Sequence, residues 1–259
     1  MEVLFIGDIV GKAGRKAVKE TLPQLLENNK LDIIIANGEN AAGGFGITPK
    51  IVKDLLESNI DLITSGNHIW DRKDIVAVLE KGNVLLRPAN YPQEVPGYGS
   101  VLFKTKTGIL VGVINVSGRV FMDTIACPFR VALQESEKLR KNTPIIIVDI
   151  HAEATSEKEA LGWFLDGRVS AVIGTHTHVQ TADERILPRG TAYITDVGMA
   201  GSLDSVIGIK KEIAIQRFLT QIPQKFEIAK ENIHLQGVLI AIDDNTGKCN
   251  DIKRVNVAL

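Results

Sequence analysis

The chain has 259 residues, 44% of them hydrophobic, which is enough for one large domain or two small ones with a buried core. Its 30 lysines and arginines nearly balance 31 aspartates and glutamates, so bulk charge does not suit it to bind duplex nucleic acid or an anionic membrane. The sequence has neither an apolar run of the roughly 18 residues that a membrane span needs nor a signal-peptide pattern in its opening segment. We therefore expect a cytoplasmic protein. Its two cysteines, Cys127 and Cys249, are too far apart to form a metal-type pair, and we expect packed thiols.

Short β-branched runs, each bounded by turn or polar residues, predict buried strands in the first two thirds of the chain. They cover residues 2–7, 31–36, 61–64, 144–150 and 170–173. Stretches with helical spacing lie between them, and Thr48 before Pro49 predicts one helix start, while Ser156 with Glu159 matches a capping box. This alternation predicts crossover units and a largely parallel sheet covered on both faces.

The middle and the end of the chain are richer in extended segments. These segments cover residues 100–104, 109–116, 191–195, 233–243 and 252–257. Asn245-Thr246-Gly247 predicts a hairpin turn between the last two. The simplest architecture is an α/β fold of two packed β-sheets, one mostly parallel and one more antiparallel, with helices outside. Without a linker or a repeat, we expect a single domain over residues 1–259.

Polar side chains gather directly after the predicted strands, where open α/β sheets bind their ligands. They are Asp8, Glu39, Asn40, Asn67, His68, His151, His176 and His178. Taken singly, each has an ordinary explanation as a turn residue, a helix cap or a hydrogen-bonded core histidine. Taken together, carboxylates, imidazoles and amide oxygens are the ligands of Mn²⁺, Fe or Zn²⁺, and their number favours a two-metal site.

The order of these motifs resembles the signature of calcineurin-like metallophosphoesterases. The strings Asn37-Gly38-Glu39-Asn40-Ala41-Ala42-Gly43-Gly44-Phe45-Gly46, Asp149 to Ser156 and Thr175 to Arg185 resemble the YmdB-like bacterial branch in particular. Val10 stands where the wider superfamily has a histidine, and Glu39 where it has an aspartate, and both departures match that branch. The resemblance covers nearly the whole chain and implies a four-layer αββα metallophosphoesterase sandwich with two metal ions.

The resemblance also implies a role for each motif residue. Two ligand sets follow, the first made of Asp8, Glu39, Asn40 and His178, and the second of Glu39, Asn67, His151 and His176. Glu39 would bridge the two ions, and His68, outside both sets, would be the general acid for the leaving oxygen. A hydroxide activated by the two metals would attack phosphorus. The donor types favour Fe or Mn as the metal and are compatible with Zn.

Two other segments are candidates for contact with the substrate. Arg119 and Phe121 lie in a loop that pairs a guanidinium with an aromatic ring, which suits a phosphate and a base, although a packed loop is the slightly favoured explanation. The glycine-containing connections at 196–198 and 204–208 are candidates for the rim of the site.

The leading functional hypothesis is a metal-dependent phosphodiesterase acting on a small molecule. The resemblance implies cyclic nucleotides, with 2′,3′-cyclic AMP first and 3′,5′-cyclic AMP second. The alternatives are a phosphomonoesterase or protein phosphatase, and a regulatory protein whose metal centre binds a nucleotide with little turnover. Association into a homo-oligomer is compatible with the sequence, which leaves the oligomeric state open.

Overall fold

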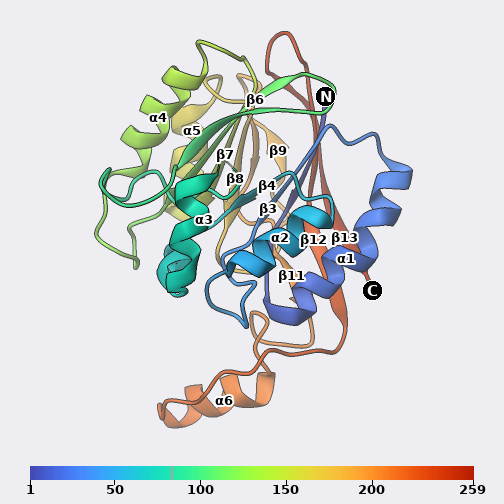
Figure 1. The fold of residues 1–259 in the computed structure, drawn as a ribbon, viewed down its shortest axis with the longest axis vertical. Coiled ribbons are helices and arrows are strands. Elements are labelled where there is room, and N and C mark those ends of the chain that lie inside the picture. The colour runs from blue at the N-terminus through green and yellow to red at the C-terminus, as the bar shows by residue number, and fades with distance from the viewer. Residues whose placement is uncertain (83) are drawn as a thin grey trace.

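The structure, a computed structural model, describes residues 1–82 and 84–259. Two β-sheets pack face to face, and helices cover the outer face of each sheet, giving four layers (Figure 1). The strand β1 (Glu2–Ile6) shows why the sheet is covered on both faces. Val3 and Phe5 belong to the core between the sheets, whereas Leu4 and Ile6 pack under the helices. Alternate side chains of a strand point to opposite faces, so a strand that is apolar at every position needs a layer on each side.

The first sheet has the strand order β2-β11-β12-β1-β3-β4, with β13 paired to β12. Its strands are β1, β2 (Asp8–Ile9), β3 (Ile33–Asn37), β4 (Leu62–Thr64), β11 (Met199–Ser202), β12 (Ile233–Ile242) and β13 (Cys249–Ala258). The strands β1, β3 and β4 are parallel, while β12 pairs antiparallel with β1, β11 and β13. The turn predicted at 245–247 lies in the hairpin between β12 and β13.

The second sheet has the order β5-β6-β7-β8-β10-β9. Its strands are β5 (Ser100–Lys104), β6 (Leu110–Ser117), β7 (Ile146–His151), β8 (Ala171–Thr175), β9 (Arg185–Ile186) and β10 (Ala192–Ile194). The four central strands are parallel, and the edge strands β5 and β9 are antiparallel to their neighbours. The second sheet is thus the more parallel of the two and the first the more antiparallel, as expected, although each combines parallel strands with antiparallel partners.

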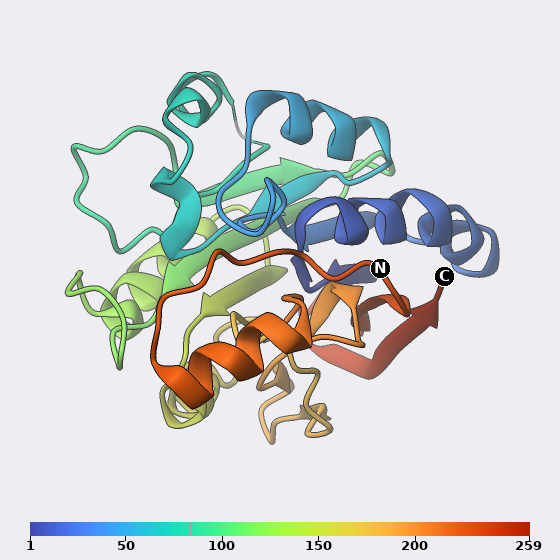
Figure 2. The same cartoon turned by 90° about the horizontal axis from the view of Figure 1, so that it is seen from below.

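The outer layers are helical. The helices are α1 (Gly11–Asn28), α2 (Pro49–Glu57), α3 (Val76–Lys81), α4 (Pro128–Leu139), α5 (Thr155–Leu165) and α6 (Lys211–Thr220), with short 3-10 helices η1 (Asn67–Trp70) and η2 (Lys73–Ile75). The helices α1 and α2 cover the first sheet, and α4 and α5 cover the second (Figure 1). The helix α6 stands apart from both sheets, and Figure 2 shows it in front of the sandwich when the molecule is seen from below.

The two predicted helix starts have different outcomes. Thr48 caps α2, because its hydroxyl accepts a hydrogen bond from the Ile51 amide and Pro49 occupies the first turn. The capping box at Ser156 and Glu159 is wrong: α5 begins at Thr155, so Ser156 already lies inside the first turn. Of the helices in the described residues, none combines the length and the apolar character needed to cross a bilayer.

Candidate active site

The predicted ligands come together at one end of the sandwich, because each follows or ends a strand whose carboxyl end points there. Asp8 begins β2 just after β1, Glu39 and Asn40 follow β3, and Asn67 and His68 begin η1 after β4. From the second sheet, His151 is the last residue of β7, and His176 and His178 follow β8. The site therefore lies where the carboxyl ends of the central strands of both sheets meet.

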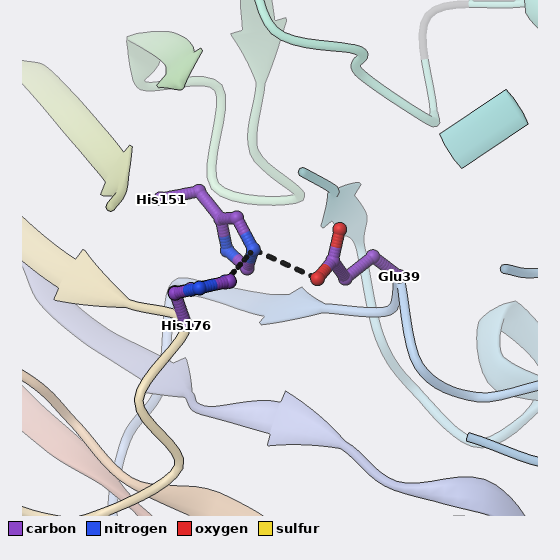
Figure 3. A group of neighbouring side chains, drawn as sticks. All are labelled: Glu39, His151 and His176. Carbon is purple, nitrogen blue, oxygen red and sulfur yellow. Dashed lines mark hydrogen bonds and ion pairs between the residues drawn. The ribbon is translucent and has the colours of Figure 1, made fainter. Parts of the chain in front are cut away.

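Three of these residues, Glu39, His151 and His176, direct ligand atoms at one point (Figure 3). His151 Nε2 lies 2.7 Å from Glu39 Oε1 and 2.9 Å from His176 Nδ1. Both histidine rings also touch edge to face, with centroids 4.7 Å apart. A carboxylate oxygen and two imidazole nitrogens at such separations form a ligand set that a divalent metal ion can occupy.

A second group adjoins the first through Asn40. Its amide nitrogen lies 3.1 Å from His178 Nε2, 3.2 Å from Glu39 Oε1 and 3.4 Å from Asp8 Oδ1. A half-turn of the terminal bond exchanges nitrogen and oxygen, so the amide can present either atom to this position. Glu39 Oε1 contacts both groups, so this carboxylate lies between them.

Hydrogen bonds behind the rings determine which nitrogen of each histidine faces the site. His178 Nδ1 donates to the carbonyl oxygen of Ile207, 2.8 Å away, which leaves the lone pair of Nε2 directed inward. His151 Nδ1 lies 2.9 Å from the hydroxyl of Thr175, and that hydroxyl donates to Asp149 at 2.7 Å. Since the hydroxyl proton goes to Asp149, His151 Nδ1 is the donor, and Nε2 is the nitrogen that faces Glu39 and His176.

Two fully buried carboxylates, Asp8 and Glu39, lie in the site. Burial disfavours ionisation of Asp8 and Glu39, but His178 beside Asp8 and His151 beside Glu39 outweigh it and hold both carboxyl pKa values below their usual range. Burial likewise disfavours a charged His151, yet the Glu39 carboxylate raises its pKa to about 9. Burial and the nearby His151 lower the pKa of His176 to about 3. The charged imidazole of His151 thus balances part of the carboxylate charge, and a bound metal cation would take over that role by displacing the proton from Nε2.

The buried side-chain oxygen of Asn67 also indicates that the site suits a metal cation. Among the described residues, Asn67 Oδ1 is buried without a hydrogen-bond partner, which is costly for an amide oxygen unless a ligand satisfies it. The preceding Gly66 leaves room for this arrangement, because a Cβ there would lie 2.1 Å from His151 and 2.4 Å from Glu39. The residues present therefore fit a metal centre that uses Asn67 as a ligand.

His68 lies beside the ligands with its ring at the cavity. Its backbone amide donates to Glu39 Oε2 at 3.0 Å, and its Nδ1 faces Asp71 Oδ2 at 3.0 Å. The carboxylate of Asp71 accepts the Nδ1 proton and orients the ring, so Nε2 is the nitrogen that faces the cavity and can exchange a proton with a ligand.

The cavity beside these residues has a volume of about 250 Å³ and two kinds of lining. The ligand side chains and Glu153 form its polar side, and the other side is apolar.

Arg119 and Phe121 do not line the cavity: the Phe121 side chain is 89% exposed, and the Arg119 amide donates to Glu157. Their contact with a substrate stays a prediction. Ile207, from the connection expected at the rim, does line the cavity.

Some contributors were not found from the sequence. Glu153 Oε2 lies 3.2 Å from His176 Nε2, and its spacing of two from His151 was the available signal, since both positions face the same way in an extended chain. Asp196, from the other connection expected at the rim, does not line the cavity; it is buried and accepts hydrogen bonds from the amide and the hydroxyl of Thr177, the residue between the last two histidines, a role that the sequence did not indicate. Such contacts join segments distant in sequence, and local patterns do not reveal them.

Comparison with known proteins gives consistent results. The family model described as "YmdB-like protein" matches residues 4–255. A Bacillus subtilis (strain 168) protein named 2′,3′-cyclic-nucleotide 2′-phosphodiesterase is 51% identical over 255 residues, which cover 98% of this chain and 96% of that protein.

A crystal structure of a hypothetical protein from Thermus thermophilus has a TM-score of 0.93 at 41% identity, covering 100% of this chain and 99% of that one. A crystal structure titled as a novel phosphatase, from Mycoplasma pneumoniae, also has a TM-score of 0.93, at 36% identity, with 100% and 93% covered. The match of the family model across nearly the whole chain, with relatives of this identity and coverage, shows that the chain belongs to the YmdB-like family.

Proposed function

We propose that this chain is a metal-dependent phosphodiesterase that hydrolyses 2′,3′-cyclic nucleotides, with 3′,5′-cyclic nucleotides as a second substrate class. The observation that carries the proposal is the convergence of carboxylate, imidazole and amide ligands beside a histidine that stays outside the ligand set. The printed name of the Bacillus subtilis relative supports the substrate class. The cavity volume, about 250 Å³, suits a small molecule.

Two ion sites follow from the two groups around Glu39. Asp8, Asn40 and His178 would hold one ion, and Asn67, His151 and His176 the other, with Glu39 between them. When bound, the metal ions supply Lewis-acid stabilisation of phosphate charge and a water molecule of lowered pKa, and Fe or Mn suits these donors.

His68 completes the chemistry as the general acid. Hydrolysis adds water to phosphorus and breaks the P–O2′ bond, so O2′ must take up a proton and the product is a 3′-phosphomonoester. His68 Nε2 can donate that proton at the cavity, while Asp71 on Nδ1 keeps the ring oriented. The proton that enters with the water balances the one that His68 gives up.

The test is hydrolysis of 2′,3′-cyclic AMP by Mn²⁺-reconstituted protein, with His68→Ala beside it. We expect turnover to fall by about 10²–10⁴-fold while metal content stays unchanged. His234→Ala is the matched control, because this histidine lies on β12 and bonds Asn232 and Asn256, away from the cavity. Loss of metal and turnover together would make His68 a ligand instead.

A second candidate, phosphomonoesterase activity, is favoured by the structural neighbour titled as a phosphatase. The same assay separates the two when it includes 3′,5′-cyclic AMP, bis(p-nitrophenyl) phosphate and p-nitrophenyl phosphate. Preference for the monoester would support the phosphatase. Metal and nucleotide binding without turnover of any of the four compounds would support a regulatory binding protein.

A further inference from the structure

A projecting arm forms one side of the cavity. The arm consists of residues 206–229 and carries α6 away from the sandwich (Figures 1 and 2). The two strands of the arm pair close to the sandwich. Ile209 and Ile228 form an antiparallel bridge there, and the amide of Lys210 donates to the carbonyl oxygen of Glu227 at 2.9 Å. The base of the arm therefore has a defined position beside the metal ligands.

The arm supplies most of the apolar lining. Four arm residues face the cavity together with Phe45, which follows the Glu39 motif: Ile207, Ile209, Phe226 and Ile228. We call these five residues the apolar wall. Gly44 lets the arm approach the body, because its φ is +103° and a Cβ there would lie 2.8 Å from Ile228.

Two aromatic rings dominate the apolar wall. Phe45 and Phe226 are nearly parallel, with centroids 6.4 Å apart and an angle of 23° between the rings. The Phe45 ring also contacts the His68 ring edge to face, with centroids 5.0 Å apart, so the apolar wall adjoins the proposed proton donor. The guanidinium of Arg217 lies 4.8 Å from the centre of Phe226 and holds that ring by a cation–π contact.

We propose that the apolar wall binds the nucleobase of the substrate, an inference that rests on the proposed function. A cyclic nucleotide is charged at its phosphate and flat and weakly polar at its base, and the cavity has the same division between its ligand side and its apolar side. Phenylalanine rings stack on any base, and the wall offers no hydrogen-bonding side chain to select among them. We therefore expect tolerance among the bases, with purines favoured for their larger stacking area.

The alternative place for a base is the loop at Phe121. That ring is 89% exposed, whereas Phe226 is half-buried and lies at the cavity. An aromatic ring held beside a cavity loses less conformational freedom on binding than a freely exposed one. The structure therefore favours Phe226 over Phe121.

The experiment compares two substrates with the same reacting group, adenosine 2′,3′-cyclic phosphate and methyl riboside 2′,3′-cyclic phosphate, which lacks the base. We expect Phe226→Ala to lower kcat/KM for the adenosine compound by about 5- to 150-fold, the loss of one base–aromatic stack, and to leave the methyl riboside compound unchanged. Phe218→Ala is the matched control, because this ring lies on α6, is 76% exposed and does not line the cavity. Calorimetry with adenosine 3′-monophosphate gives a second measurement that needs no turnover.

The outcomes separate this inference from the proposed function. Equal losses on both substrates, or a base-dependent loss in Phe121→Ala instead of Phe226→Ala, would overturn the inference and leave the phosphodiesterase intact. If the wild-type protein hydrolyses neither substrate, the proposed function fails. Weaker binding of adenosine 3′-monophosphate to Phe226→Ala would then still support a base site, and unchanged binding would refute it.

Discussion

The turn that carries two of the proposed metal ligands depends on a buried ion pair. His176 and His178 have φ values of +100° and +63°, a region that costs a non-glycine residue roughly 1–3 kcal/mol each. Asp196 supports the turn from behind by accepting from the amide of Thr177 at 2.9 Å and from its hydroxyl at 2.8 Å. Hydrogen bonds to a charged acceptor contribute about 1.5–3 kcal/mol each, which is comparable to the strain.

Lys158 neutralises the Asp196 carboxylate. The Lys158 ammonium lies 2.8 Å from Asp196 Oδ2, and both side chains are fully buried. Asp196→Asn leaves the buried ammonium without its counter-charge, so we expect a loss of about 3–5 kcal/mol in the free energy of unfolding. Because the turn also loses its charged acceptor, we expect Mn²⁺ affinity to fall by about 10- to 100-fold.

Guanidinium chloride unfolding and calorimetric titration with Mn²⁺ measure the two effects. The control is Asp166→Asn, a nearly buried aspartate at the end of α5 that accepts from the amide of Arg189. Asp166→Asn should lower the free energy of unfolding without changing Mn²⁺ affinity. The double variant Lys158→Met/Asp196→Asn should recover part of the stability, since it removes both charges. Unchanged Mn²⁺ affinity in a folded Asp196→Asn protein would refute a role for this pair in holding the ligands.

Further predictions address the metal site, the proton donor and the core. Glu39→Gln should abolish tight Mn²⁺ binding in a calorimetric titration, since Glu39 is shared by both ligand groups. Asp71→Asn should reduce kcat less than His68→Ala does, because it perturbs the orientation of the ring and leaves the proton donor itself in place. Gly174→Ala should cost about 3 kcal/mol or more in denaturant unfolding, because its Cβ would lie 1.7 Å from a backbone carbonyl oxygen. Burial raises the pKa of Cys249 to about 11, so at pH 8 its thiol stays protonated, and mass spectrometry should show slow alkylation until the protein is unfolded.

Much of the fold and the ligand set could be predicted because both depend on local patterns. Runs such as 31–36 and 144–150 are apolar at nearly every position, which indicates strands buried on both faces, and the structure has β3 and β7 there. Polar residues directly after such runs must emerge at the carboxyl edge, so sequence alone could group Glu39 with His151 before any contact was known.

The apolar wall could not be predicted, because it depends on pairing between distant segments. Nothing near Phe226 in the sequence indicates that it lies beside Phe45, since that contact follows from the bridge between Ile209 and Ile228. Conversely, the loop at Phe121 has the composition of a base-binding segment, but composition does not determine where a loop points. In the structure Glu157 accepts the amides at the start of that loop, and its aromatic ring faces solvent.

The arm also links specificity to the metal centre through one residue. Ile207 offers its side chain to the apolar wall and its carbonyl oxygen to His178 Nδ1. Its φ of +50° is unfavourable for a β-branched residue, so the surrounding contacts must hold this backbone in place. The ligand histidine uses only the backbone of Ile207, and therefore side chains of the arm can change without moving His178. On the proposed role of the apolar wall, its side chains can thus change how a base is bound while the residues proposed as metal ligands stay in place.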